Sequence, residues 1–233
     1  MIAPVGLVLP YRFESVIQHM RLFVSVTVIL VICCGSVWAQ DISELRSQAK
    51  SGDAAAQYEL GLFYDSKNGR RRDQRRAVDW YTKSAEQNYA RAQFNLGRMF
   101  ILGRGVEADE NHGIELQINA ANQGLAEAQL AIGKRYFAGV ALEQDYQQAL
   151  DLFEKAANQG LVDAQNQLAT MYFQGEGVDK DVVRAHKWFS IAAGNNDQSA
   201  RRYLPVLEGV MDEAQIENAR AMAAQWLAER AAE

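Results

Sequence analysis

The strongest constraint on the fold of this chain is an internal repeat with a period of 36 residues. The hexapeptide AANQGL occurs at Ala120–Leu125 and again at Ala156–Leu161. Shifting the chain against itself by that offset aligns further positions that share a residue type. These positions are Ala56, Ala92, Ala128 and Ala164, each followed by Gln; Leu60, Leu96, Ile132, Leu168 and Leu204; and Gly61, Gly97, Gly133 and Ala169. A fixed period of this length is typical of a solenoid.

The spacing of these positions predicts two helices in each repeat. Ala56, Leu60, Gly61 and Tyr64 stand at i, i+4, i+5 and i+8, which is one face of a helix. A glycine inside a helix costs about 1 kcal/mol relative to alanine. Its recurrence therefore indicates a close approach by a second helix, which we predict at Arg76–Ala85 and its copies. The expected gap fillers between the helices are Trp80, Leu116, Leu152 and Trp188.

Glycine-containing segments separate the two helices of a repeat. They read GRGVEAD at 103–109, AGVALEQD at 138–145 and GEGVDKD at 175–181. The aspartate that closes each segment is predicted to be the N-cap of the following helix. These are Asp109, Asp145 and Asp181. No strand precedes these glycines, so they do not indicate a phosphate-binding loop. Ala141 replaces the second glycine of its turn, which leaves the geometry there open.

Taken together, the pattern A-x-x-x-L-G-x-x-Y, G-x-G-V-x-x-D and A-x-x-W-x-x-x-A-A-x-Q-G resembles the Sel-one-like repeat family. This family is related to the tetratricopeptide repeats. The resemblance implies an all-α fold, a right-handed α-solenoid of antiparallel helix pairs with about eleven helices, in a secreted bacterial protein. The sequence departs from the pattern at Lys67, Gly113, Leu116 and Ala141.

The repeats predict the division of the chain. We expect an N-terminal extension with a signal at 1–39, a capping helix at 40–52, repeats at 53–89, 90–125, 126–161 and 162–197, and a half-repeat with a capping helix at 198–233. Pro205 occupies the glycine position of the last first-helix, so we expect a kink or an early stop there. Asp212 and Gln215 resemble a capping box that opens a helix to about Arg230.

The N-terminal segment has the order of a secretory signal. Arg21 precedes an apolar run from Leu22 to Cys34, and cleavage is expected after Ala39, with Met20 a possible true start. The predicted location is secreted, in the periplasm of a Gram-negative cell. The alternative is an uncleaved anchor in the inner membrane. Both cysteines lie in the signal, so the mature chain would lack disulfides and thiolate metal sites.

The sequence offers no catalytic constellation. The chain has 24 basic and 29 acidic residues, and this net charge of −5 argues against a nucleic-acid partner. Its mature part holds two histidines, His112 and His186, which we predict to lie at the surface or beside turns. Neither has a second histidine at helical spacing, and no cofactor, metal or active site is expected.

Two candidate binding surfaces emerge from the repeat. The first helices would line a groove for a protein or peptide partner through Tyr58, Leu62, Phe94, Arg98, Leu130, Lys134, Asn166 and Thr170. The alternative is that the aromatic positions are inter-repeat core. A cationic patch is formed by Lys67, Arg70, Arg71, Arg72, Arg75 and Arg76. It either contacts a membrane, an acidic glycan or an acidic protein, or is a solvated turn with internal ion pairs.

These observations favour a non-enzymatic scaffold or adaptor of the bacterial cell envelope. The resemblance implies protein–protein interaction, with the partner bound in the concave groove of the solenoid. One alternative is a membrane-tethered assembly factor, which requires that the signal stays uncut. A second is a hydrolase of cell-wall or β-lactam material, but the family branch linked to that activity carries paired cysteines in its repeats.

Overall fold

The structure, a computed structural model, describes residues 42–66 and 70–232, and within them the regular elements are all helices. The predicted signal and its cleavage point lie outside the described residues. Residues 42–50 are helical and precede the first labelled helix. No helix within the described ranges combines the length and the apolar character that crossing a membrane requires.

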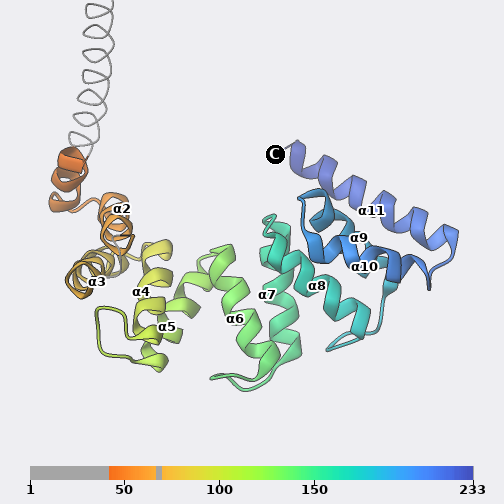
Figure 1. The fold of residues 1–233 in the computed structure, drawn as a ribbon, viewed down its shortest axis with the longest axis horizontal. Helices are drawn as coiled ribbons and strands as arrows, with labels where there is room; N and C mark the ends of the chain where they lie inside the picture. The colour runs from red at the N-terminus through yellow and green to blue at the C-terminus, as the bar shows by residue number, and fades with distance from the viewer. Residues whose placement is uncertain (1–41, 67–69, 233) are drawn as a thin grey trace, which may run out of the picture.

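The helices form consecutive pairs along the chain (Figure 1). The pairs are α2 (Ala54–Asp65) with α3 (Arg71–Ala85), α4 (Ala90–Leu102) with α5 (Glu110–Asn122), α6 (Ala126–Ala138) with α7 (Tyr146–Asn158), and α8 (Val162–Gln174) with α9 (Val182–Gly194). Each second helix also packs against the first helix of the next pair. The chain ends in α10 (Gln198–Glu208) and α11 (Glu213–Ala231).

Aspartates are the N-caps of α5, α7 and α9, as predicted, whereas α3 follows Arg70, which makes no side-chain capping bond. Asp109 accepts a hydrogen bond from the amide of His112 at 3.0 Å, and Asp181 accepts one from the amide of Arg184 at 2.9 Å. Asp145 accepts from two amides of the first turn of α7. Each bond satisfies a donor that has no partner inside the helix, which fixes where the helix starts.

The turn that lacks a glycine keeps the conformation of its neighbours. Gly105 and Gly177 have φ angles of 75° and 72°, and Ala141 has a φ angle of 61° at the equivalent position. An L-residue with a side chain loses roughly 1–2 kcal/mol in this left-handed region. The repeat therefore imposes its turn on Ala141 against the local preference of alanine.

Close helix approach explains the glycines inside the first helices. A Cβ atom built on Gly61 would stand 2.5 Å from the ring of Tyr81, and one on Gly133 would stand 2.7 Å from the ring of Phe153. The predicted close approach of the two helices is confirmed. The rings that contact these glycines are Tyr81 and Phe153, each one residue after the predicted gap fillers Trp80 and Leu152. Buried rings at this position fill the space that the missing side chain leaves.

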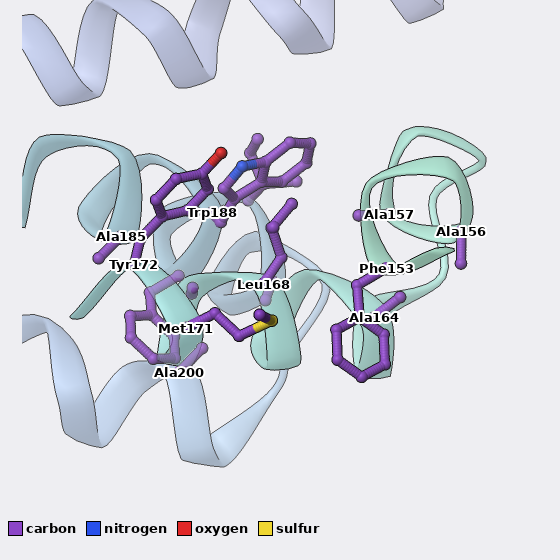
Figure 2. Packing of buried hydrophobic residues seen from close by; sticks show 14 of the residues in the cluster. Phe153, Ala156, Ala157, Ala164, Leu168, Met171, Tyr172, Ala185, Trp188 and Ala200 are labelled. Carbon is purple, nitrogen blue, oxygen red and sulfur yellow. The ribbon is translucent and has the colours of Figure 1, made fainter. Parts of the chain in front are cut away.

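The C-terminal half holds the largest buried cluster. Figure 2 shows small alanine side chains beside large ones from α7, α8 and α9. The labelled residues are Phe153, Ala156, Ala157, Ala164, Leu168, Met171, Tyr172, Ala185, Trp188 and Ala200. Alanine lets neighbouring backbones approach, while Phe153, Leu168 and Met171 are fully buried and fill the remaining volume.

The last helix packs against α9, and its Arg230 donates to backbone carbonyls of Asn158 and Gln159 at the end of α7. The predicted capping box of Asp212 and Gln215 is present, and the Trp226 ring meets the Trp188 ring edge-on at 5.7 Å. The expected early stop at Pro205 is wrong, because α10 continues through it to Glu208. The proline removes one hydrogen bond of the helix and crowds the carbonyl four residues earlier, yet three further residues continue the helix before it ends.

Candidate functional site

The most suitable surface for a partner is a hollow of about 530 Å³ between the first helices of repeats two and three. Helices α4 and α6 form its sides, and α5 contributes its floor. The lining residues are Phe94, Arg98, Ile101, Leu102, Gln117, Ala131, Lys134, Arg135 and Val140. Three of the predicted groove residues, Phe94, Arg98 and Lys134, thus come together at one place.

The hollow exists because the second repeat departs from the pattern of the others. The position held by the fully buried Tyr81, Phe153 and Phe189 carries Gln117 in α5. The backbones also approach closely here, since a Cβ on Gly97 would stand 2.5 Å from the carbonyl oxygen of Gly113. A thin glutamine replaces a ring, so the space above it is open to solvent.

Gln117 lines this hollow, and one of its side-chain acceptors is buried. The residue is 3% exposed, and its Oε1 atom has no hydrogen-bond partner within the described part of the chain. A buried polar atom without a partner costs roughly 1–3 kcal/mol. Such an atom requires an explanation in a folded protein, and its place on the floor of a hollow supplies one.

The rim of the hollow is cationic. Arg98 and Lys134 are exposed, and neither forms an ion pair with another described residue. Arg135 is engaged, because its Nη1 lies 3.2 Å from Oε1 of Glu110. No carboxylate belongs to the described residues that line the hollow. Two uncompensated cations therefore flank an apolar wall in a chain whose net charge is −5.

Tyr58 and Leu130 do not belong to an exposed groove. They are only 8% and 9% exposed, and the Tyr58 ring packs against the rings of Tyr81 and Tyr89 at 6.0 and 5.3 Å. The alternative, that these positions are core, is therefore correct for these two residues. Stacking of one repeat on the next turns this part of the helix face inward, where large apolar side chains gain most from burial.

The remaining predicted groove residues lie apart from the hollow. Leu62 is half-buried and packs against the core of the first repeat. Thr170 is half-buried, and its hydroxyl donates to the carbonyl of Asn166 at 2.8 Å. The Oδ1 atom of Asn166 is buried without a partner among the described residues. These three side chains therefore remain a proposal only, as an extension of the surface.

Sequence reasoning missed most of the apolar wall and the floor. Leu102 and Val140 are 59% and 57% exposed, and with Ile101 they form the apolar part of the lining. Gln117 could have been found by aligning the repeats, since it alone is polar in a position that otherwise holds rings. Leu102 and Val140 carry no such signal, because their exposure depends on how the turns are placed.

Part of the cationic patch lies on helix α3, and one of its arginines contacts neighbouring side chains. Lys67 lies outside the described residues. Arg71 begins α3, so the arginines from there to Arg76 lie on a helix and not in the predicted turn. Arg76 lies 3.5 Å from Asp73 and over the ring of Tyr64. Arg70, Arg71, Arg72 and Arg75 remain exposed, and two of them, Arg71 and Arg75, line a shallow hollow of about 380 Å³.

A larger hollow of about 890 Å³ lies beside the 175–181 turn, and several of its polar groups bond to one another. Tyr172 donates to Glu154 at 2.9 Å, and Arg184 lies 3.3 Å from Asp181. Burial, reinforced by the bond to Glu154, raises the pKa of the Tyr172 hydroxyl above its ordinary value of 10.0. The lining also includes Asp179 and Lys180, which are exposed and of opposite charge, so this hollow has no excess of one sign of charge at its mouth.

His186 corrects the prediction that both histidines lie at the surface. It is 1% exposed, and its Nε2 lies 3.1 Å from Oε1 of Glu208, which also accepts from Arg220 at 2.8 Å. Ser190, one turn further along α9, lies 3.2 Å from Nδ1. This group of side chains joins α9 to α10 and α11. The hydrogen bonds from His186 and Arg220 lower the pKa of the Glu208 carboxyl below its ordinary value of 4.5.

The fold and this surface define an α-solenoid of helix pairs with an open hollow on its first helices. The Sel1 repeat pattern matches residues 54–89, 90–125, 126–161 and 162–197. The chain belongs to the Sel1 repeat family. This confirms the resemblance and the predicted fold class, and proteins built from Sel1 repeats generally mediate protein–protein interaction.

Two solved structures are similar to this chain. One is c5321, a protective antigen of uropathogenic Escherichia coli strains with an SLR fold, at 34% identity and a TM-score of 0.69. That match covers 78% of this chain but only 39% of the other protein, so this chain spans less than half of it. The second is a Sel1 repeat protein from Oxalobacter formigenes, at 31% identity and a TM-score of 0.63, covering 75% and 74% of the two chains. No curated protein is significantly similar.

Proposed function

We propose that this protein is a non-enzymatic scaffold of the bacterial cell envelope, which binds a segment of a partner protein on the first helices of its solenoid. The observation that carries the proposal is the hollow between α4 and α6. It combines exposed apolar side chains with two cations and a buried acceptor that have no ion-pair or hydrogen-bond partner among the residues the structure describes. Apolar and polar groups converging in one open hollow are what a protein or peptide segment requires.

The envelope location rests on the order of residues 20–39. A basic residue, an apolar run and a small residue before the expected cut are the features of a secretory signal. Sequencing the N-terminus of the protein isolated from its host tests this. A start at Gln40 supports secretion. A start at Met1 or Met20 in a membrane fraction supports the tethered alternative instead.

Site-specific photo-crosslinking tests the scaffold proposal in the full chain. Benzoylphenylalanine in place of Leu102 would stand at the wall of the hollow. In place of Leu227 it would stand on the exposed side of α11, where the native side chain is 50% exposed. The proposal expects a discrete crosslinked partner from position 102 and none from position 227. Equal recovery of proteins from both positions, or of none from either, would overturn it.

A further inference from the structure

We infer that the hollow recognises an acidic segment with one bulky apolar side chain, held in an extended conformation. This inference rests on the proposed function and names the chemistry of the partner. Three separate features of the hollow carry it, namely its wall, its rim and its floor. The wall would bind an apolar side chain, the rim would bind negative charge, and the floor would bind a hydrogen-bond donor. An extended peptide can supply all three groups together.

The wall of the hollow requires an apolar anchor. Phe94 and Ile101 are half-buried, and Leu102 and Val140 remain more than half exposed beside them. Large exposed apolar side chains around a hollow favour the burial of one complementary side chain. Ala131 lies opposite on α6, and its small side chain leaves room for a leucine or an aromatic ring.

The rim requires negative charge. Arg98 stands on α4 and Lys134 on α6, so the two cations lie on the two helices that form the sides of the hollow. Neither is paired with a carboxylate among the described residues, whereas Arg104 and Arg135 nearby are paired with Asp65 and Glu110. Acidic side chains before and after the anchor would complete the two missing ion pairs.

The floor requires a hydrogen-bond donor. The Oε1 atom of Gln117 is buried and unpaired, and the equivalent positions in the other repeats hold apolar or aromatic rings. An extended peptide presents backbone amides between its side chains. A peptide amide next to the anchor would donate a hydrogen bond to Oε1 of Gln117. Binding would then recover the free energy that the buried acceptor costs the free protein.

The test uses fluorescein-labelled synthetic peptides and the full chain. The probe has a central phenylalanine flanked on both sides by alternating aspartate and serine. Two matched peptides carry lysine for aspartate, or alanine for phenylalanine. We expect the probe to bind, and each matched peptide to bind at least about tenfold more weakly in fluorescence anisotropy. Equal binding of the lysine peptide, or no binding of the probe, would overturn the inference.

Variants locate the binding. Arg98→Glu with Lys134→Glu should weaken probe binding at least about tenfold, whereas Lys50→Glu with Arg202→Glu changes the net charge equally at exposed positions outside both candidate surfaces and should not. Equal losses in both double variants would remove the hollow as the site. Retained crosslinking of a partner at position 102 beside failed probe binding would leave the scaffold proposal standing and reject only the acidic chemistry.

Gln117→Met separates recognition from folding. Methionine has a similar length and no acceptor, so the free protein should unfold at a higher temperature, while probe binding weakens about three- to tenfold. A purely structural role would move stability and binding in the same direction. A variant that is less stable, or that binds as tightly as the parent, would contradict the assignment of Gln117 to the partner.

Discussion

Gln159 donates a hydrogen bond from Nε2 to Oε1 of Gln129 at 2.8 Å, between side chains 30 residues apart. Gln123 makes the same bond to Gln93 one repeat earlier, and Gln87 makes it to Gln57 two repeats earlier. Each acceptor also donates to the end of the preceding second helix, as Gln129 does to the carbonyl of Ala121 at 3.3 Å. These buried amides therefore tie each helix pair to the next.

The series is interrupted at the fourth repeat, which yields the first prediction. Gln165 donates to Ala157, but its Oε1 atom is buried without a partner among the described residues, because Asn195 stands where the donor would be. Asn195→Gln should stabilise the protein by about 1 kcal/mol by completing the bond. Urea unfolding measures the change. Asn122→Gln, at an exposed position on α5, is the control, and an equal gain there would refute the explanation.

A second prediction concerns the left-handed residue Ala141. Ala141→Gly should raise the free energy of unfolding by about 0.5–1 kcal/mol, because the relief of strain exceeds the added chain entropy. The reverse change at the equivalent position, Gly105→Ala, should destabilise more strongly, since its Cβ would stand 2.5 Å from the backbone of Gln74. Thermal unfolding of both variants checks the opposite signs.

A third prediction follows from the carboxyl of Glu208. Its folded pKa lies below its ordinary value of 4.5, so the carboxylate stabilises the fold above about pH 4.5, and this stabilisation is lost as the pH falls through the folded pKa. Glu208→Gln should therefore be less stable than the parent near pH 5, and the difference should shrink near pH 3. Urea titrations at both pH values measure it. Glu217→Gln, an exposed substitution on α11, is the matched control for the loss of one carboxylate.

A fourth prediction concerns the cap formed by α11. Trp226 donates from Nε1 to Oδ1 of Asn158 at 3.2 Å and packs against Trp188, so Trp226→Ala should cost about 2 kcal/mol. In a solenoid each repeat contacts only its neighbours. Hydrogen exchange should accordingly rise in α7–α11 and stay unchanged in α2–α4. Leu227→Ala, on the exposed side of the same helix, should leave both regions unchanged.

The fold was predictable because its determinants recur every 36 residues. Aspartate N-caps, alanine positions and the final capping box act within one helix or between neighbours, so a local pattern is enough to reveal them. Local sequence patterns gave wrong predictions of exposure where the packing of neighbouring helices buries a side chain. Tyr58 and His186 look like surface residues in the sequence, yet stacking of the adjacent helices buries both.

The candidate site was predictable only in part. Phe94, Arg98 and Lys134 were nominated from their helix face, and the structure places all three on one hollow. The same reasoning chose Leu130 at an equivalent position, and there the space is filled. The 36-residue period places equivalent residues on the same face of every first helix. It therefore does not indicate in which repeat that face is exposed to solvent.

The sequence by itself determined the helix pairs, their caps and their order, because hydrogen bonding and side-chain periodicity act over one or two turns of chain. Only the tertiary structure decided that Gln117 has no partner and that Leu102 and Val140 stand beside it. Burial and pairing depend on how closely whole helices approach. That distance is set jointly by Gly97, Gly113 and the side chains of three helices, which lie far apart along the chain.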